Sequence, residues 1–463
     1  MTTKFFKYIF FIVTTTLALA ACKVTQPYET PELQTTNLYR EQNTEDTATI
    51  AGLKWTALFT DTTLQRLISE GVAGNPDLQI AYTRIQQARA YYGQSKAALL
   101  PSFDANAGFS ASKLSEAQGF GIRNSATQYE LGVSSVWEAD IWGKLRSSKR
   151  AGFASLLQTE AAARAVQTRL VADIATYYYL LMALDQQLAI TQQTVSNWDI
   201  TVQTMRLLKE SARVTEAAVV QSEAQRYAAE VTLPDLAQSI KETENALSIL
   251  LGSAPSAIYR GNLENQQAAS SLQTGVPAQL LANRPDVQEA ELSFRYYFEL
   301  TNVARTYFYP SLSITGSAGL SALSLSNLFD PASFAASIGA GLTQPIFNRR
   351  VNKTRLEVAK AQQQEALLGF RNTLLNAGRE VSDALSLYET ALEKINIRSK
   401  QMTALRNSVN YSQELLENGF ANYTEIITAR QSLLQAELGG VNDRLQQLQA
   451  VVNLYRSLGG GWQ

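Results

Sequence analysis

Apolar and polar residues alternate one by one in two pairs of segments, about 102–111 with 128–142 and about 311–320 with 333–347. A period of two predicts β-strands whose two faces meet different surroundings. In 128–142 the odd-numbered side chains are mostly apolar and the even-numbered ones mostly polar. Strands of about 9–11 residues with this pattern cross bilayers in β-barrels. Half-buried strands of a soluble sandwich alternate in the same way, so the pattern alone leaves both environments open.

Apolar residues recur every three or four positions after each strand pair, which predicts long amphipathic helices. No proline interrupts about 144–208 or 350–415, and helices of that length reach about 100 Å at about 1.5 Å per residue. Such lengths favour coiled-coil pairing over a globular bundle. Pro234 should kink or break the helix between about 216 and 251. The most regular stripe comprises Leu434, Leu438, Val441, Leu445, Leu448, Val452 and Tyr455.

The chain contains a tandem repeat. The segment 75–79, which includes Pro76-Asp77, recurs at 284–288 with Pro285-Asp286, an offset of 285 − 76 = 209 residues. Each half should hold a helix ended by a proline, a strand pair and long helices. Two further matches share the offset: Leu100-Pro101 with Tyr309-Pro310, and Thr215-Glu216 with Thr424-Glu425. The divisions expected are a signal peptide (1–21), an N-terminal equatorial or anchor segment (22–74), a first repeat (75–255), an equatorial linker (256–283) and a second repeat (284–463).

The N-terminus has the pattern of a bacterial lipoprotein signal. Lys4 and Lys7 form a short basic region at the start of the chain. The apolar stretch that begins there has about 15 residues, which is the length of a signal peptide and shorter than a typical transmembrane helix. The stretch ends in small residues before Cys22, the only cysteine of the chain. We expect lipid on this thiol, although an ordinary signal peptide with an incidental cysteine would look similar. Lys23 follows instead of the aspartate that often retains lipoproteins in the inner membrane, which favours the outer membrane.

Composition narrows the possible chemistry. The chain has 463 residues, no histidine, one cysteine and a formal charge of −1. These counts exclude His/Cys metal sites, Ser-His triads and disulfides, and we expect no catalytic residue, no cofactor and no metal. An enzyme would have to use carboxylates, lysine, tyrosine or serine alone. A nucleic-acid partner is not expected, because it would require a clustered basic surplus.

Four amphipathic strands cannot close a barrel, and open strand edges are not tolerated in lipid. The chain must therefore associate, and three copies would supply about 12 strands. The long striped helices also need neighbours. A lipoprotein signal, membrane strands and long helices together indicate a β-barrel in the outer membrane, continued by a helical tube through the periplasm. This duct would carry solutes and catalyse nothing.

Three runs of residues resemble the motifs of a known family. They are 281–291 around Arg284, Pro285 and Asp286, then 303–312, and the C-terminal Leu458-Gly459-Gly460-Gly461-Trp462. Together they look like the outer-membrane factors (TolC/NodT type), in particular the lipoproteins of RND-type efflux pumps. On physical grounds alone, Pro285 and Asp286 also suit a helix N-terminus.

The resemblance covers nearly all of the chain after the signal peptide and implies a mixed, TolC-like fold. It implies a homotrimer in which a transmembrane β-barrel, four strands from each copy, continues into a coiled-coil periplasmic α-barrel. The implied partners are a periplasmic adaptor (membrane fusion protein), an inner-membrane transporter and outer-membrane lipid. The Arg-Pro-Asp run and the Gly-Gly-Gly-Trp ending favour the exit duct of a tripartite efflux pump. The alternative is the outer-membrane component of type I protein secretion.

The same resemblance assigns roles to the two helical turns, at about 209–215 and 417–423. Adaptor docking is expected at Ser211, Arg213, Gly419 and Phe420. The segment after the second turn lines the periplasmic gate in the family and carries carboxylates. Matching from Gly419 onwards places one carboxylate at Glu425, but the other falls on Thr428 and is missing. The expected gate comprises Glu425 with Tyr423, Ile426 and Ile427 as an apolar collar; a solvated charge at a helix N-terminus is the simpler interpretation of Glu425.

Two other classes of protein remain as weaker alternatives. A periplasmic adaptor lipoprotein also has a helical hairpin, but it would contain lipoyl-like and soluble β-barrel segments instead of a long repeat. A lipoprotein that hydrolyses or binds carbohydrate would need paired acids in a cleft. The acidic residues here are spread along helical faces instead.

Overall fold

The structure is a computed structural model that describes residues 24–33, 35, 38–40, 48–113, 125–267, 273–420 and 422–463. The expected signal peptide (1–21) and Cys22 lie outside the described residues. Contacts divide the chain into two compact units. The first contains the described residues up to Glu32 with Arg84–Thr159 and Glu289–Phe370; the second contains Leu33–Thr83, Glu160–Gln288 and Arg371–Gln463.

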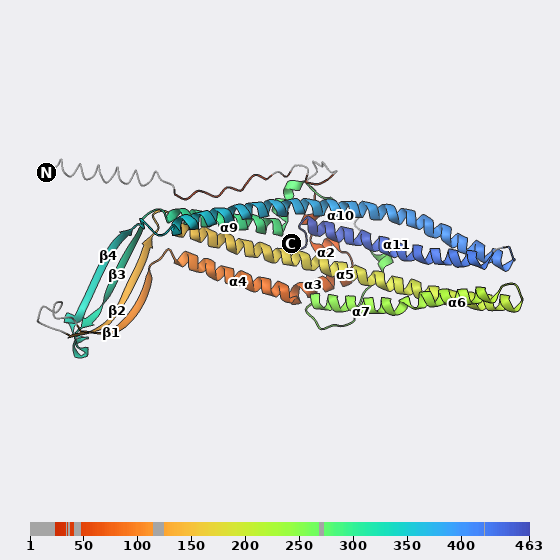
Figure 1. Ribbon diagram of the computed structural model, residues 1–463, viewed down its shortest axis with the longest axis horizontal. Helices are drawn as coiled ribbons and strands as arrows, with labels where there is room; N and C mark the ends of the chain where they lie inside the picture. Colours follow the sequence, from red (N-terminus) through yellow and green to blue (C-terminus); the bar gives the residue numbers. More distant parts are fainter. Residues whose placement is uncertain are drawn as a thin grey trace. The chain divides into compact units, whose positions relative to one another are not determined.

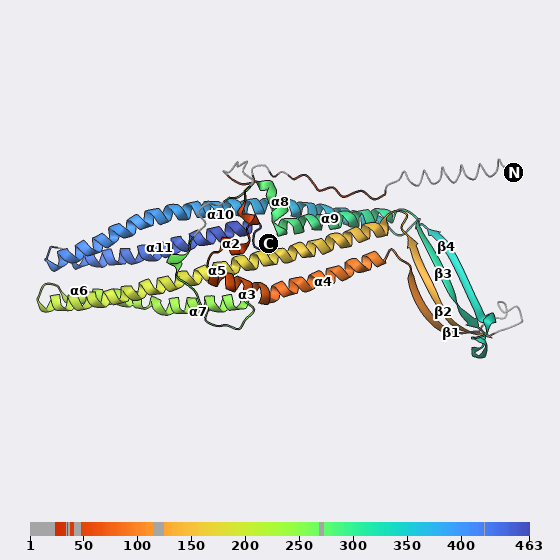
Figure 2. The same ribbon diagram turned by 180° about the vertical axis from the view of Figure 1, so that it is seen from behind.

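The first unit contains an antiparallel sheet of four strands in the order β1-β2-β3-β4 (Figures 1 and 2). Both predicted strand pairs are present, and β2 pairs with β3 to join them. Strands β1 and β4 have one neighbour each, so both outer edges of the sheet are open within the described chain. The strands are β1 (Ser102–Lys113), β2 (Ser125–Ala139), β3 (Ser311–Ala322) and β4 (Phe334–Thr343).

The register separates the sheet into one apolar and one polar face. Val133 stands opposite Ala105 and Ala318, whereas Ser134 stands opposite Asp104 and Ser317. Because residues directly opposite each other point to the same side, this alternation extends across all four strands. The predicted separation of odd and even positions in β2 is therefore confirmed. Apolar-face residues include Phe103, Ala107, Phe109, Tyr129, Leu131, Trp137, Leu312, Ile314, Leu320, Phe334, Ile338 and Leu342.

The predicted long helices are also confirmed. Helices α5 and α10 have 67 residues each. None of the described helices combines the length and apolar composition needed to cross a membrane. The main helices are α4 (Pro76–Ala97), α5 (Lys144–Glu210), α6 (Glu216–Glu230), α7 (Thr232–Leu250), α9 (Pro285–Thr306), α10 (Val351–Glu417) and α11 (Tyr423–Ser457), with the shorter α2 (Trp55–Leu58), α3 (Thr62–Gly74) and α8 (Leu280–Asn283).

Prolines set several helix boundaries. Pro76 and Pro285 are the first residues of α4 and α9, where a missing backbone N–H costs no hydrogen bond. Pro234 stands in the first turn of α7, and the helix is broken between Glu230 and Thr232. The predicted break is therefore confirmed, and its cause is the tolerance of proline in a first turn but not in a helix interior.

The repeat is visible in the order of elements, but its offset changes along the chain. Helices α4 and α9 start 285 − 76 = 209 residues apart, whereas α5 and α10 start 351 − 144 = 207 apart. The change occurs in the strand pairs, because Phe103 pairs with Ser135 but its counterpart Leu312 pairs with Leu342. The second pair is thus connected by two fewer residues. The predicted match of Thr215-Glu216 with Thr424-Glu425 is wrong, since Thr215 and Asn422 are the equivalent N-caps.

Candidate functional site

The polar face of the sheet is lined by small and acidic side chains. Asp104 and Glu130 lie on this face, and Glu138 forms an ion pair with Lys144 at 2.9 Å. Gly132 and Gly319 stand opposite each other across β2 and β3. A Cβ added to Gly319 would lie 2.5 Å from Gly132 Cα, so the strands approach more closely there than any other residue permits.

The second unit contains the turn ends of two helical hairpins, α5–α6 and α10–α11, and the two turns contact each other. Ala212 (φ 57°) and Gly419 (φ 79°) adopt the left-handed conformation at equivalent positions of the two turns. The expected counterpart of Gly419, Ser211, therefore lies one residue too early. Arg213 Nη2 donates to the Glu417 carbonyl at 2.9 Å and joins the turns, which the sequence did not predict.

The second turn exposes an apolar surface. Phe420 is 82% exposed, and Tyr411 and Leu415 are exposed beside it on α10. These residues line a shallow groove with Glu414 and Asn418. We name Tyr411, Leu415 and Phe420 the tip patch. Ser211 at the first turn instead donates its hydroxyl to Leu207 O at 2.9 Å and offers no comparable surface. Sequence reasoning identified Phe420 but missed Tyr411 and Leu415.

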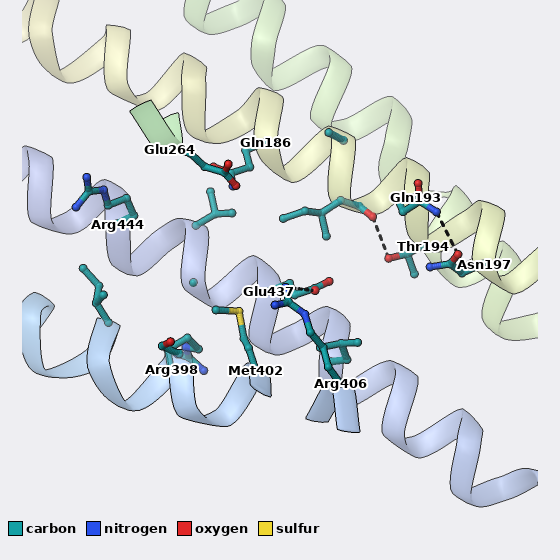
Figure 3. Close-up of a pocket in the computed structure, with 17 residues that line it drawn as sticks. Gln186, Gln193, Thr194, Asn197, Glu264, Arg398, Met402, Arg406, Glu437 and Arg444 are labelled. Carbon is teal, nitrogen blue, oxygen red and sulfur yellow. Dashed lines mark hydrogen bonds and ion pairs between the residues drawn. The ribbon is translucent and has the colours of Figure 1, made fainter. Parts of the chain in front are cut away.

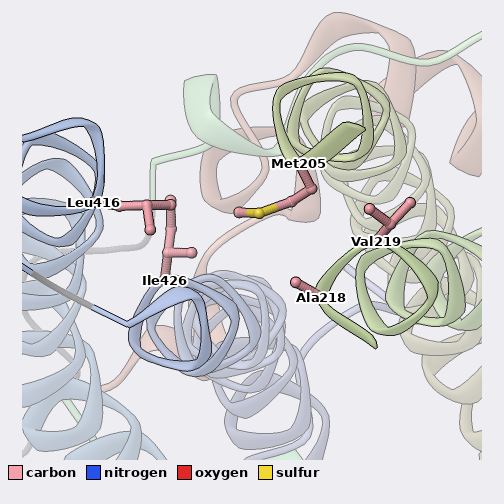
Figure 4. Packing of buried hydrophobic residues seen from close by; sticks show 5 residues of the cluster. All are labelled: Met205, Ala218, Val219, Leu416 and Ile426. Atoms are coloured by element: carbon pink, nitrogen blue, oxygen red, sulfur yellow. The ribbon is translucent and has the colours of Figure 1, made fainter. Parts of the chain in front are cut away.

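The expected gate residues separate into two groups. Glu425 is exposed in the first turn of α11, whereas Ile426 and Ile427 are each 3% exposed. Ile427 packs against Trp198 and Ala229, and Tyr423 packs against the surroundings of both isoleucines. Both isoleucines thus hold α11 against neighbouring helices of the same chain. Figure 4 shows the residues around Ile426, which are Met205, Ala218, Val219 and Leu416.

Arg430 lies one turn beyond this cluster and joins three helices. Its guanidinium donates to the Asn197 carbonyl of α5 and to Gln413 Oε1 of α10, both at 3.2 Å. Burial lowers the pKa of this arginine. Arg430 is only partly buried, and its two hydrogen bonds compensate for the water that this partial burial removes from the guanidinium.

Arg284 occupies the centre of an ionic cluster in the second unit. It is 6% exposed and forms two hydrogen bonds with Asp286, at 2.9 and 2.6 Å. It also binds Glu380 of α10 at 3.0 Å and the Ser457 carbonyl of α11 at 2.8 Å. Burial lowers the pKa of Arg284, but the two carboxylates outweigh this and raise it overall. The residue thus fastens the start of α9 to α10 and to the end of α11.

A cavity of about 830 Å³ lies between α5 and the α10–α11 hairpin (Figure 3). Two arginines that line it form ion pairs, since Arg406 binds Glu437 at 3.0 Å and Arg398 binds Asp443 at 2.9 Å. Asp443 is 1% exposed and also binds Lys394 at 2.7 Å. A Cβ on Gly439 would lie 2.9 Å from Arg398 Cζ, which accounts for a glycine in the middle of α11. The charged side chains around the cavity thus link α10 to α11.

Across the described part of the chain, no three His, Cys, Asp or Glu side chains gather in a way that could hold a metal ion. The notable arrangements are instead structural: a two-faced sheet, two linked hairpin turns and buried ion pairs.

Comparison with known proteins decides between an outer-membrane channel subunit, a periplasmic adaptor and a carbohydrate-acting lipoprotein. A sequence profile described as "Outer membrane efflux protein" matches residues 67–253 and 276–460. The chain belongs to the outer membrane efflux protein family. The earlier resemblance to outer-membrane factors is thereby confirmed.

Relatives in this family cover nearly the whole chain. Outer membrane protein OprJ of Pseudomonas aeruginosa is 30% identical over 458 residues, which are 96% of this chain and 94% of OprJ. The solvent efflux pump outer membrane protein SrpC of Pseudomonas putida is 28% identical over 96% of this chain and 97% of its own length. The cation efflux system protein CusC of Escherichia coli (strain K12) is 28% identical with the same coverage.

Solved structures in the family share the fold. A membrane protein from Pseudomonas aeruginosa is 26% identical and superposes with a TM-score of 0.87, covering 95% of this chain and 100% of that one. A CusC structure gives a TM-score of 0.84 at 26% identity, with the same coverage. The predicted TolC-like fold is therefore confirmed, and the chain is an outer-membrane efflux component of this family.

Proposed function

We propose that three copies of this chain form the exit duct of a tripartite efflux pump. The observation that carries the proposal is the sheet, which has one apolar face, one polar face and two open edges. A sheet of this kind meets the requirements of lipid only when further strands close it into a barrel with its apolar face outward. Three copies of four strands would give a 12-stranded barrel. The duct is passive, and no residue of it is catalytic.

The long helices extend this duct through the periplasm, with the hairpin turns toward the inner membrane. A periplasmic adaptor docks at the turns and connects the duct to an inner-membrane transporter. The tip patch supports this assignment, because exposed aromatic residues are typical anchors of protein interfaces. Arg213 joins the two turns beside the tip patch, and Gly419 gives the second turn its left-handed residue. Ser211, in the first turn, belongs to the same proposed docking surface. The proposed repeats, 75–255 and 284–463, each contribute one hairpin.

The proposal is tested by complementation. Expression of the chain with its genomic pump partners in a bacterium that lacks its own exit ducts should restore resistance to at least one class of drugs, solvents or metal cations. SrpC and CusC are named for efflux of solvents and of cations respectively, which justifies that panel. Phe420→Ser should lose resistance while the purified protein still conducts ions. Restored secretion of a protein substrate without any resistance would instead establish type I secretion.

We also propose that lipid on Cys22 anchors the chain to the membrane. Gln26 and the Asn302 side chain exchange two hydrogen bonds, of 3.0 and 2.9 Å. A Cβ on Gly143, just before α5, would lie 3.2 Å from Thr25 Oγ1. These contacts hold Thr25 and Gln26 beside α9 and the start of α5, near the level where the membrane surface is expected. A mature N-terminal peptide that carries no acyl mass would contradict the anchor.

Glu425 controls ion selectivity at the periplasmic gate. It is exposed at the start of α11, while Tyr423, Ile426 and Ile427 fix that start against the neighbouring helices. Threefold symmetry would bring three Glu425 carboxylates together, and a ring of like charges attracts cations into a narrow opening. Glu425→Gln should therefore weaken cation preference in planar bilayers, and Glu425→Lys should abolish or reverse it.

Glu414→Gln provides the control for this measurement, because Glu414 lines the groove beside Phe420 on α10. It should leave ion selectivity unchanged. If both Glu425 variants form trimers and conduct with unaltered selectivity, Glu425 lies outside the pore.

A further inference from the structure

The charge of the chain changes abruptly between β4 and α10. Residues 334–348, which comprise β4 and most of the linker after it, contain no Asp, Glu, Lys or Arg. The segment 349–360 that follows contains five basic side chains and one acidic side chain. The whole chain is nearly neutral, with a formal charge of −1, so this positive excess is local. It lies at the end of β4 where α10 starts (Figure 1).

The first repeat has a similar basic run where β2 leads into α5, but most of its charges are paired within the chain. Three of the four basic residues between positions 144 and 150 form ion pairs with N···O distances of 3.0 Å or less. These pairs are Lys144–Glu138, Arg146–Asp140 and Arg150–Glu299. The first basic run therefore serves the fold itself.

The basic run after β4 has much weaker partners. Arg350 Nη2 and Lys353 Nζ share the carboxylate of Glu357, and each lies 3.9 Å from it, beyond hydrogen-bond distance. Arg349 is exposed and forms no ion pair with any described carboxylate. Arg349 (φ 52°) and Arg350 (φ 68°) also adopt the left-handed conformation, which residues with a side chain rarely do. We name Arg349, Arg350 and Lys353 the basic cluster.

Two exposed apolar side chains precede the basic cluster. Ile346 is 100% exposed and Phe347 is 85% exposed. They follow Ile338 and Leu342 on the apolar face of β4, which are 86% and 67% exposed. An uncharged strand, then an aromatic residue, then basic residues is the order expected where a chain leaves the hydrocarbon of a bilayer and passes its headgroups.

The charges favour a phospholipid over a second copy as the occupant of this surface. In the proposed barrel, a second copy that joined β4 through its β1 would bring the residues between α4 and β1 to this level. The segment 96–104 contains only one basic and one acidic residue, Lys96 and Asp104, and Asp104 lies on the polar face of the sheet. It cannot neutralise three cations. A phosphate group is anionic and accepts paired hydrogen bonds from an arginine.

We propose that Ile346, Phe347 and the basic cluster form a binding site for an anionic phospholipid of the periplasmic leaflet. Ile346 and Phe347 enter the boundary between headgroups and acyl chains, and the basic cluster binds the phosphate. The inference rests on the proposed barrel, which sets the level of the membrane. It adds a class of lipid and the residues that recognise it.

Lipid retention tests the proposal. The trimer is reconstituted into phosphatidylcholine vesicles that contain phosphatidylglycerol and is then extracted into mild detergent. Native mass spectrometry counts the lipids that stay bound, and the parent trimer should retain phosphatidylglycerol in preference to phosphatidylcholine. Each basic residue near an anionic surface raises the affinity about fivefold, so Arg349→Gln, Arg350→Gln and Lys353→Gln together should lower phosphatidylglycerol retention by about tenfold or more.

The matched control removes three exposed basic side chains further along α10, in the combined variant Arg371→Gln, Arg379→Gln and Lys400→Gln. It should retain phosphatidylglycerol as the parent does. Arg349→Lys with Arg350→Lys should keep most of the preference, because the charge is kept. Equal losses in the two triple variants would show that net charge, and not this site, attracts the lipid. Unchanged retention in the basic-cluster variant would also overturn the site.

Fluorescence quenching locates the apolar part of the site. Phe347→Cys allows a fluorophore to be attached there, and phospholipids with a nitroxide near the headgroup should quench it. The only other cysteine is Cys22, whose thiol the proposed lipid blocks, and the parent chain treated in the same way gives the background. Tyr411→Cys, near the other end of α10, is the control and should not be quenched.

A fluorophore at position 347 that is shielded from the quencher in an intact trimer would show that a second copy covers this surface. That result would overturn the lipid site and leave the proposed duct standing. A parent chain that forms no trimer in the vesicles would instead overturn the duct itself. The two failures are therefore distinguishable.

Discussion

Arg284→Leu should lower the free energy of unfolding by about 3 kcal/mol, at the low end of the range for breaking a buried ion pair. The change leaves Asp286 and Glu380 without their shared cation and removes the donor to the buried Ser457 carbonyl. The two carboxylates are partly exposed, so water offsets some of the loss and keeps the effect below the upper end of that range. The measurement is denaturant unfolding in detergent, followed by the helical circular dichroism signal.

Arg379→Leu is the matched control, because Arg379 precedes Glu380 on the same helix and forms an exposed ion pair with Asp383. Exposed pairs of this kind contribute less than about 1 kcal/mol. Arg284→Lys should fall between the two, since lysine keeps the charge but cannot form the forked contact with Asp286. Similar stabilities for Arg284→Leu and Arg379→Leu would show that the cluster does not hold α9, α10 and α11 together.

Val133→Arg should destabilise the membrane-inserted protein by about 2–4 kcal/mol, the cost of a basic side chain at the middle of a lipid-facing strand. Val133 lies on the apolar face between Ala105 and Ala318, neither of which can pair with the charge. Ser134→Arg, one residue along, should be tolerated, because Ser134 lies on the polar face opposite Asp104. Urea unfolding of protein refolded into lipid vesicles measures both variants.

The comparison is informative because the two variants add the same side chain to adjacent residues of one strand. Equal stabilities of the two variants would mean that the apolar and polar faces of the sheet are in the same environment. A larger loss for Ser134→Arg would mean that the polar face is turned toward lipid, contrary to the proposed barrel.

Strand faces and helix ends were predictable from the sequence because they depend on local rules. The alternation in 128–142 assigns each side chain to a face without any knowledge of its cross-strand partner. Pro76, Pro285 and Pro234 mark helix starts because proline is tolerated only in a first turn. Each of these features depends on a few neighbouring residues.

The buried ion pairs were not predictable, because their partners are far apart in the chain. Arg284 meets Glu380 across 96 residues, and Asp443 meets Arg398 across 45. Many exposed acids and bases have the same spacing, and only the packed helices decide which ones meet. The need for glycine at position 439 was unpredictable for the same reason. A side chain there would collide with Arg398, which belongs to another helix and lies against α11 at that point.

The directions of the expected gate side chains were also not predictable from the sequence. Ile426 and Ile427 were grouped with Glu425 by their place in the chain, and the structure places both isoleucines among neighbouring helices. Adjacent residues on a helix point about 100° apart, so neighbours in sequence need not share a surface. The sequence could indicate the segment but not the direction of each side chain.

The open edges of the sheet also bear on how the protein reaches its membrane. A single chain that entered lipid would expose the unpaired backbone groups of β1 and β4, each costing several kcal/mol. Chains should therefore associate before they insert into the membrane, and the rate of insertion should rise steeply with chain concentration. Dilution during biogenesis would leave monomers stranded in the periplasm, where the same edges invite aggregation. Chaperones that shield strand edges would be expected to determine the yield.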